Sequence, residues 1–268
     1  MSRPPHRDAM REASALFQAG AVLLPVLGVT LILGLEMSIP DGLFVAFLLA
    51  TLPLLSMAQL PLLHAGEVER LPAYAGSAAM LAFLAALGLL LGHLGPGLGA
   101  LGLTATGSAT EWRILGGLVL AVGGLGVAFH FLGEWLGLEE TPVLKELIPR
   151  TPKERRFFGI LSLAAGFGEE VVYRGYLLAV LAPLFSGSWS AAVVSSLAFA
   201  VLHVYQGPVG MVRAGLLGFL FAGAFILGGT LWPLVVVHTG VDLVSGLWLG
   251  PRMLNTETRG PEAPSDDE

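Results

Sequence analysis

Long apolar runs recur along almost the whole sequence, and they constrain the fold more than any other feature. A helix needs about 20 apolar residues to cross a hydrocarbon core of about 30 Å, and most of these runs reach that length. The sequence therefore predicts an all-α, polytopic membrane protein, a bundle of about eight transmembrane helices. The eight runs span residues 15–35, 42–63, 75–94, 114–137, 157–184, 188–205, 209–229 and 231–249.

The composition agrees with a membrane location. Of 268 residues, 54% are hydrophobic and 13% are charged, and the mean hydropathy is +0.77. These values lie outside the range of soluble globular domains. The runs lack the two-residue alternation of barrel strands, so helices are the expected form. The net charge of -6 argues against a nucleic-acid partner, and the absence of cysteine excludes disulfides and a cysteine nucleophile.

The basic residues predict the orientation of the bundle. Apart from Arg174, every Lys and Arg except Arg113 falls on one side of an eight-helix arrangement. The positive-inside rule then places both termini in the cytoplasm. The expected organisation is a cytoplasmic N-terminal segment (1–14), four helices (15–137), a cytoplasmic linker (138–156), a second group of helices (157–249) and a disordered cytoplasmic tail (250–268).

The stretch AGFGEEVVYRGYLL places three charged side chains inside one of the apolar runs. Each ionised group there costs roughly 3 kcal/mol on insertion scales, so Glu169, Glu170 and Arg174 need a compensating role. Glu169 and Glu170 differ by about 100° around an α-helix, and we expect them to point to different places. Glu170 and Arg174 stand at i, i+4 and are expected to pair, which leaves Glu169 free for a reaction.

Two later stretches place histidines in apolar surroundings: FAVLH, with Phe199 and His203, and HTGVD, with His238 and Asp242. Each pair shares one helix face, because residues four apart are neighbours on a helix. In the order EExxxR, FxxxH and HxxxD, the three motifs resemble the CPBP (Abi, CAAX-protease-like) family of intramembrane endopeptidases. The resemblance covers roughly residues 155–249, and the first four apolar runs are only generically similar.

The resemblance implies hydrolysis of a peptide bond by activated water. Glu169 and His203 would activate the water, and His238 and Asp242 would stabilise or orient the oxyanion. The family often has asparagine where this chain has Asp242. Because an ionised aspartate only accepts hydrogen bonds, we expect Asp242 to hold His238 in one tautomer through a hydrogen bond. The remaining motif residues would have supporting roles: Glu170, Arg174 and Phe199.

Depth sets a further condition on the site. If the fifth helix enters the membrane at Phe157, Glu169 lies about 18 Å along it, whereas His203 lies near the cytoplasmic end of the sixth helix. We therefore expect the fifth helix to start in the cytoplasm or to tilt strongly. Glu169 would then share an inward-facing cavity with His203 and His238.

No cofactor is expected, and a zinc site built from glutamate, two histidines and aspartate is the alternative. The expected partners are the lipid bilayer and a hydrophobic peptide or membrane-anchored protein as substrate. Arginine far exceeds lysine in this alanine- and glycine-rich chain, as in GC-rich bacteria. The bacterial inner membrane is therefore the expected location, and a prenylated substrate is not expected.

Two other functions fit the same residues. A proton or ion pathway also lines a helix bundle with carboxylates, histidines and an arginine. The second alternative is a catalytically silent scaffold that protects the cell from a peptide toxin, since immunity roles are attributed to members of the family. Paired charges can also simply tie membrane helices together. His130 and Glu134, at i, i+4, are interpreted as an interfacial pair outside the site.

Overall fold

The first half of the protein forms four long helical rods. The computed structural model describes residues 5–65, 68–137, 141–185, 187–252 and 254. Three of the rods are the single helices α1, α4 and α5, and the other is continuous through α2, a π-helical segment η1 and α3. The bounds are α1 (Pro5–Gly34), α2 (Ile39–Ala46), η1 (Phe47–Thr51), α3 (Leu52–Ala65), α4 (Arg70–Leu94) and α5 (Ala109–Leu136).

The second half forms four more rods after one short helix, α6 (Pro142–Glu146). A second π-helical segment, η2, joins α7 to α8 in one continuous rod. The bounds are α7 (Pro152–Glu169), η2 (Glu170–Tyr176), α8 (Leu177–Leu181), α9 (Ser188–Leu202), η3 (Val204–Gln206), α10 (Gly207–Gly228), α11 (Trp232–Val244) and η4 (Ser245–Leu249).

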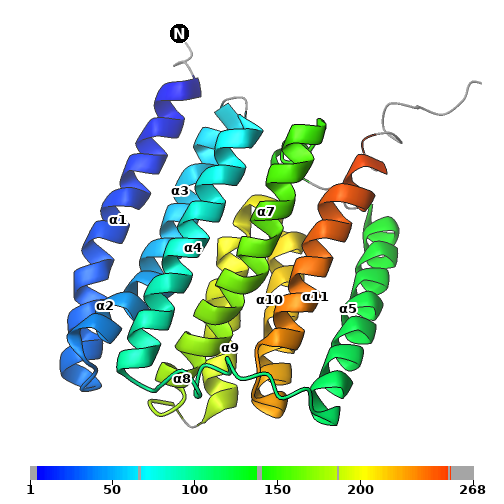
Figure 1. Ribbon diagram of the computed structural model, residues 1–268. Helices are drawn as coiled ribbons and strands as arrows, with labels where there is room; N and C mark the ends of the chain where they lie inside the picture. The colour runs from blue at the N-terminus through cyan, green and yellow to red at the C-terminus, as the bar shows by residue number, and fades with distance from the viewer. Residues whose placement is uncertain (1–4, 66–67, 138–140, 186, 253, 255–268) are drawn as a thin grey trace, which may run out of the picture.

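The rods stand side by side in two layers (Figure 1). One layer contains α4, α7 and α11, and the other contains α3, α9 and α10, with α7 in contact with both α4 and α11. α1 and α5 stand at opposite edges of the bundle. The α7–α8 rod is therefore central, and the charged stretch identified in the sequence lies on it.

Among the described residues, six helical spans are long and apolar enough to cross a membrane, and α9 is a shorter apolar helix. The α7–α8 rod is as long, but every stretch of 18 residues within it carries at least three charged side chains. No strand occurs in the described ranges. The predicted all-α, polytopic membrane fold is confirmed.

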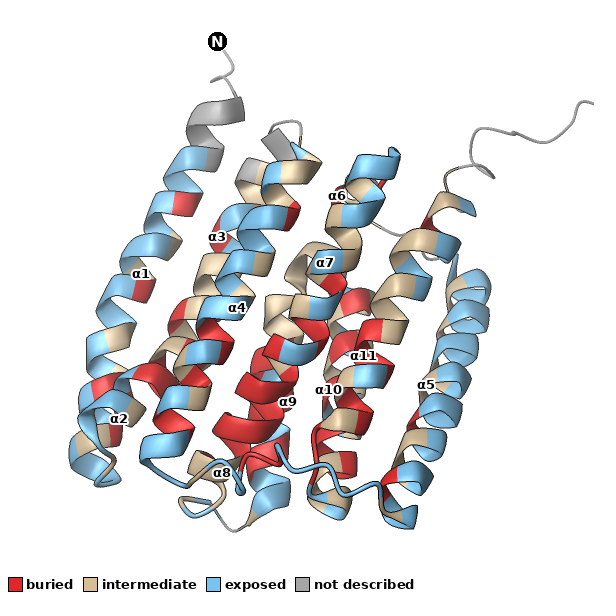
Figure 2. Cartoon of the chain, in the orientation of Figure 1, coloured by how far each residue is buried: buried red, intermediate tan, exposed pale blue. Residues whose placement is uncertain are grey.

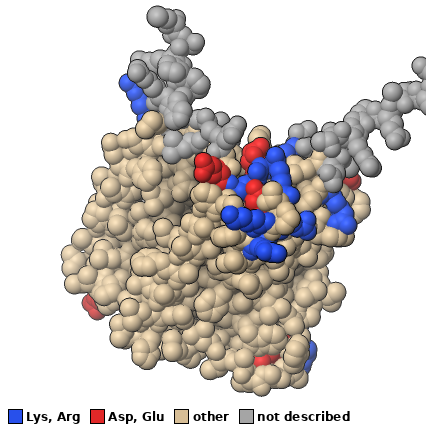
Figure 3. Space-filling model, turned by 45° about the horizontal axis from the view of Figure 1, so that its top comes forward, with Lys and Arg blue, Asp and Glu red and all other residues tan. Residues whose placement is uncertain are grey.

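Basic side chains gather at one end of the bundle (Figure 3). This end contains α6, the start of α7 and the end of α11, whereas Arg113 lies near the start of α5 at the opposite end. The distribution is the one that the positive-inside rule expects of a cytoplasmic face. We refer to this end as the cytoplasmic end, and its orientation in the membrane stays a prediction.

The boundaries differ from the sequence-based ones near the polar segments. α1 begins at Pro5, so most of the expected cytoplasmic segment 1–14 is helical. The predicted linker 138–156 contains α6 and the first turn of α7, and its residues 138–140 lie outside the described ranges, as does most of the predicted tail. α7 begins at Pro152, where Thr151 and Glu154 form a capping box. α7 thus starts five residues before the predicted boundary at 157, and its depth in the membrane stays a prediction.

Burial is concentrated around the central rod (Figure 2). All seven residues of η2 are buried, and one core cluster packs η2 and α8 against α2, α4 and α9. A second core cluster joins α4, η2, α10 and α11. By contrast, α5 buries only Glu111 and Leu118. The charged stretch therefore lies in the best-packed part of the molecule.

The connection between α4 and α5 closes the non-cytoplasmic end beneath η2. Leu101 is fully buried, and its carbonyl oxygen lies 3.1 Å from the position that a Cβ on Gly175 would take. Gly102 has φ of 69°, which favours glycine, and its carbonyl accepts a 2.8 Å hydrogen bond from the Leu231 amide. The Thr230 hydroxyl donates to the carbonyl of Thr104 at 2.9 Å.

Candidate functional site

The site begins where the α-helix changes into a π-helix. Glu169 is the last residue of α7 and Glu170 the first residue of η2. A π-helix is wider than an α-helix because its hydrogen bonds run from i to i+5, and such segments are frequent at functional sites. The sequence did not predict this segment. It changes the relative directions of the two glutamates.

Both glutamates contact a single imidazole, that of His238 on α11. Glu170 Oε1 lies 2.7 Å from Nδ1, and Glu169 Oε2 lies 3.5 Å from Nε2. The expectation that the two carboxylates point to different places was therefore wrong. The two nitrogens lie on different sides of the ring, so side chains leaving the helix in different directions can still reach it.

Glu170 and Arg174 form the expected pair, with Arg174 Nη1 donating to Glu170 Oε1 at 2.9 Å. Both side chains are at most 1% exposed. The same Oε1 therefore contacts both the guanidinium and His238 Nδ1. Gly218 on α10 makes room for this pair, since a Cβ there would lie 3.2 Å from Arg174 Nη2. Glu170 is thus neutralised and fixed by two groups.

Asp242 does not hold His238 in the way that the sequence suggested. Its Oδ2 lies 4.0 Å from His238 Nε2, which is too long for a hydrogen bond. Glu170, at 2.7 Å from Nδ1, holds His238 in one tautomer instead. An ionised carboxylate only accepts hydrogen bonds, so Nδ1 carries the proton. The i, i+4 spacing brought Asp242 to the correct face of α11, but a residue on another helix makes the shorter contact.

His203 lies at the cytoplasmic end of α9 and is held by its own helix. Its Nδ1 lies 2.9 Å from the Phe199 carbonyl oxygen, which can only accept a hydrogen bond, so Nδ1 carries the proton and Nε2 presents a lone pair. The two rings also pack, with centroids 4.5 Å apart, as predicted. Phe199 contacts His238 as well, edge to face at 6.4 Å, and thus links the two histidines.

Access to the site increases toward the cytoplasmic end. The exposed fraction of the side chain is 0% for Glu170, 10% for His238, 16% for Glu169 and 31% for Asp242. Asp242 lies one turn nearer the cytoplasmic end of α11 than His238. The inward-facing cavity itself stays a prediction.

Several polar atoms around the site are buried without a hydrogen-bond partner among the described residues, including Glu169 Oε2 and the Tyr173 hydroxyl. Tyr173 packs rather than hydrogen-bonding to Glu169, because its ring lies edge to face against Phe199 at 5.4 Å. Glu169 Oε2 is left as a buried acceptor beside His238.

Glycines near the charged stretch allow close helix contacts. A Cβ on Gly166 would clash with the hydroxyl of Thr239 and lie 2.9 Å from its amide nitrogen. A Cβ on Gly168 would lie 3.0 Å from the Leu81 carbonyl oxygen. These glycines bring α7 against α11 and α4, which places Glu169 within reach of His238.

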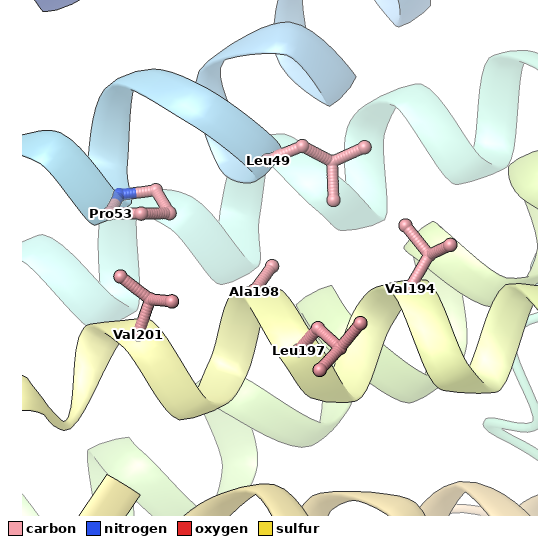
Figure 4. Close-up of a pocket in the computed structure, with 6 residues that line it drawn as sticks. All are labelled: Leu49, Pro53, Val194, Leu197, Ala198 and Val201. Atoms are coloured by element: carbon pink, nitrogen blue, oxygen red, sulfur yellow. The ribbon is translucent and has the colours of Figure 1, made fainter. Parts of the chain in front are cut away.

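An apolar groove lies between the η1–α3 rod and α9 (Figure 4). On α9 it uses residues spaced three and four apart, which share one helix face. Phe199 and His203 lie on a neighbouring face of the same helix, so the groove and the site are separated by α9. Its lining contains no titratable group: Leu49, Pro53, Val194, Leu197, Ala198 and Val201.

Phe221 on α10 is part of the site and was missed from the sequence. Its ring is stacked on the His238 imidazole, with centroids 5.7 Å apart and an interplanar angle of 13°. It also lies 5.7 Å from the Arg174 guanidinium carbon. Phenylalanine is common in this apolar helix, and no spacing distinguishes position 221, so only the packing of α10 against α11 reveals the contact.

The alternative of a zinc site is not supported by a preformed set of ligands in the described residues. Within the ranges that the structure describes, no three His, Asp or Glu side chains are grouped so that they could hold a metal ion. The two histidines direct Nδ1 to Phe199 and Glu170, respectively. Independence from a cofactor stays a prediction.

The fold and site together define a class of protein: a multi-pass membrane protein with a buried polar site. In this site two carboxylates contact the imidazole of His238, and Phe199 packs against both His238 and His203. Residues 152–244, from the first residue of α7 to the last of α11, match a protein-family model described as type II CAAX prenyl endopeptidase Rce1-like. All three motifs lie inside this segment.

This segment is therefore similar to the CAAX-protease family, a family of hydrolases that act on peptide bonds, and the resemblance seen in the motifs is confirmed for residues 152–244. No curated protein and no solved structure gives a significant match to the chain.

Proposed function

We propose that this protein is an intramembrane endopeptidase that cleaves a hydrophobic peptide or a membrane-anchored protein with water activated by Glu169 and His203. One observation carries the proposal. Glu169 Oε2 is a buried acceptor without a hydrogen-bond partner among the described residues, 3.5 Å from an imidazole whose other nitrogen is fixed by Glu170. A carboxylate removed from water is a stronger base, which suits proton abstraction.

In the proposed first step, Glu169 takes a proton from a water molecule. His203 helps to orient that water through Nε2, because its Nδ1 is engaged by the Phe199 carbonyl. The water oxygen forms a bond to the scissile carbonyl carbon, and the carbonyl π electrons move to the oxygen. The product is a tetrahedral intermediate with an oxyanion.

In the second step, His238 stabilises the oxyanion from Nε2 when that nitrogen carries a proton. Glu170 and Arg174 support this state, since the carboxylate holds Nδ1 and the guanidinium fixes the carboxylate. One donor to an oxyanion typically contributes about 2.7–4 kcal/mol to catalysis. The intermediate collapses, the C–N bond breaks, and Glu169 returns its proton to the leaving amine.

The surroundings of the site support an apolar substrate. The site lies within a bundle whose helices are apolar enough to cross a membrane, and its most exposed charged side chain, Asp242, lies toward the cytoplasmic end. We infer that the scissile bond enters from that end, in a bacterial inner membrane. Nothing in this chemistry requires a prenyl group, because no step uses one.

The test is cleavage in proteoliposomes that contain the purified protein and a set of single-span membrane peptides. Wild-type protein should cleave at least one peptide, Glu169→Gln should not, and phenanthroline should not inhibit. Cleavage that is lost with the chelator and restored by zinc would overturn the metal-free mechanism. Gradient-driven uptake without any cleavage in the same vesicles would instead establish the transport function.

A further inference from the structure

Phe221 contacts both groups that bind the same oxygen of Glu170. Glu170 Oε1 lies 2.9 Å from Arg174 Nη1 and 2.7 Å from His238 Nδ1. The Phe221 ring lies 5.7 Å from the guanidinium carbon and, stacked, 5.7 Å from the imidazole centroid. The side chain is 4% exposed. One aromatic ring thus packs against both partners of the Glu170 carboxylate.

The stacking of Phe221 restricts a movement of the His238 imidazole that its hydrogen bond with Glu170 does not prevent. A hydrogen bond at Nδ1 fixes one point of the imidazole, but the ring plane can still tilt around that point. A near-parallel ring, at 13°, restricts the tilt. If the plane tilts, Nε2 changes its position relative to Glu169 Oε2, which lies 3.5 Å away. The position of Nε2 therefore depends on the face that supports the ring.

The electrostatics of this contact favour positive charge. An aromatic face is negative, so it attracts a guanidinium or an imidazolium, and the attraction is larger where water is excluded. Phe199 provides a second face, 4.5 Å from the Arg174 guanidinium carbon, but its ring stands at 83° to the His238 imidazole, with centroids 6.4 Å apart. Of these two rings, Phe221 is the one whose face lies parallel to His238.

We propose that Phe221 is a positioning residue of the peptidase: its aromatic face sets the plane of the His238 imidazole and favours the charged form of the His238–Glu170–Arg174 group. The proposal rests on the proposed function, because the position of His238 Nε2 matters through the oxyanion. Phe221 itself touches neither water nor substrate in this scheme. The competing explanation is that Phe221 only fills the second core cluster, of which it is a member.

The test replaces Phe221 by phenylalanines with one, two and three fluorine atoms, which weaken the negative face and nearly keep the shape. The kcat for peptide cleavage should fall stepwise, by roughly 2- to 30-fold in total, with little change in KM. Phe221→Leu should lie at or below the end of this series, and Phe221→Tyr should retain most of kcat. A flat series would overturn the proposal, because a purely packing role is insensitive to fluorination.

Phe219 offers a matched control on the same helix. Its ring packs against Trp189, with centroids 5.9 Å apart, and the residue is 39% exposed, whereas Phe221 is buried. The same fluorinated series and Phe219→Leu should leave kcat and KM unchanged. An equal loss of kcat at both positions would show a general effect on α10 and would refute the assignment.

A second measurement does not depend on activity. Ring ¹⁵N signals of His238, assigned by their loss in His238→Gln, should shift in Phe221→Leu and stay in place in Phe219→Leu. If wild-type protein cleaves no peptide, the proposed function fails, but the shift still shows that Phe221 sets the state of His238. Unchanged His238 signals in Phe221→Leu would overturn the positioning role whatever the activity.

Discussion

The α7–α8 rod and α5 are two long helices of similar length that the molecule uses in opposite ways. The rod carries three charged residues at its centre, and all seven residues of its π-helical segment are buried. α5 runs for 28 residues, is far more apolar, and buries only two of them. The more polar helix thus lies inside the protein and the more apolar one lies at its edge.

The difference shows that in a membrane protein apolarity does not indicate the core. Lipid solvates an apolar helix as well as protein does, so α5 loses nothing by facing outward. Ionised groups have no such partner in lipid, and Glu169, Glu170 and Arg174 must be enclosed by protein. Charges at membrane depth are therefore better evidence of a protein interior than leucines are. The following predictions test this contrast between the two helices.

The largest effect should come from Glu169→Gln, which keeps the shape and removes the base. Peptide cleavage should fall by about 10²–10⁴-fold while the melting temperature stays nearly unchanged. His203→Ala should do the same, and the double variant should be scarcely worse than either single one, because the two residues act on one water. On α5, Glu134→Gln should leave cleavage unchanged. Substantial turnover by Glu169→Gln would remove this residue from catalysis.

Arg174→Ala should have the largest effect on stability. It leaves Glu170 buried without its guanidinium, and breaking a buried ion pair costs about 3–5 kcal/mol. Glu170→Gln added to it should restore part of the melting temperature, because the stranded charge is removed. The pair of His130 and Glu134 on α5 is about two-thirds exposed, so His130→Ala should not shift the melting temperature. Strictly additive losses in the double variant would argue against the coupling of Glu170 and Arg174.

Glycine-to-alanine substitutions should have the next largest effect, and they should affect α7 and α5 differently. Gly166→Ala forces a Cβ against Thr239 and should destabilise the protein by about 1–3 kcal/mol, measured by thermal unfolding in detergent. Thr239→Ala should rescue only part of this loss, since the backbone nitrogen stays 2.9 Å from the new Cβ. Gly124→Ala on α5 meets open space and should change stability by less than about 0.5 kcal/mol. Equal losses at both positions would contradict the burial contrast.

Asp242→Asn should be mild within the same site. Its carboxylate lies 4.0 Å from His238 Nε2 and makes no hydrogen bond to it, so kcat should fall by less than about tenfold. Glu170→Gln, which alters the group at 2.7 Å, should lower kcat more. The two kcat values, measured side by side, rank the carboxylates around His238. A larger loss for Asp242→Asn, accompanied by loss of bound zinc, would point to a metal ligand instead.

The prediction with the smallest effect on the protein concerns topology: the first residues of α5 and of α7 should lie on opposite sides of the membrane. The chain has no cysteine, so single cysteines can be introduced at Ala105, before α5, and at Lys153, in the first turn of α7. Both sites are exposed, and stability should change by less than about 0.5 kcal/mol. An impermeant maleimide should label them from opposite faces of the membrane, with Lys153→Cys on the cytoplasmic one. Labelling from the same face would refute the eight-helix topology.

The sequence alone determined the class of fold and indicated which residues form the candidate site. Runs of about 20 apolar residues leave helices as the way to satisfy the backbone in lipid, and charges inside such runs mark a functional interior. Spacing along one helix also predicted the contacts within one helix, the pairs of Glu170 with Arg174 and of Phe199 with His203. Local helix geometry was enough to predict these two pairs, because both partners lie within about one turn of the same helix.

Only the tertiary structure decided which groups meet between helices. The shift to a π-helix at Glu170, the meeting of both glutamates on His238, the 4.0 Å gap at Asp242 and the stacking of Phe221 all depend on how four rods are rotated and placed. No spacing in the sequence encodes these rotations. They follow from the summed packing of many small contacts, such as Gly166 on Thr239 and Gly218 beside Arg174, each of which is weak and none of which has a pattern of its own.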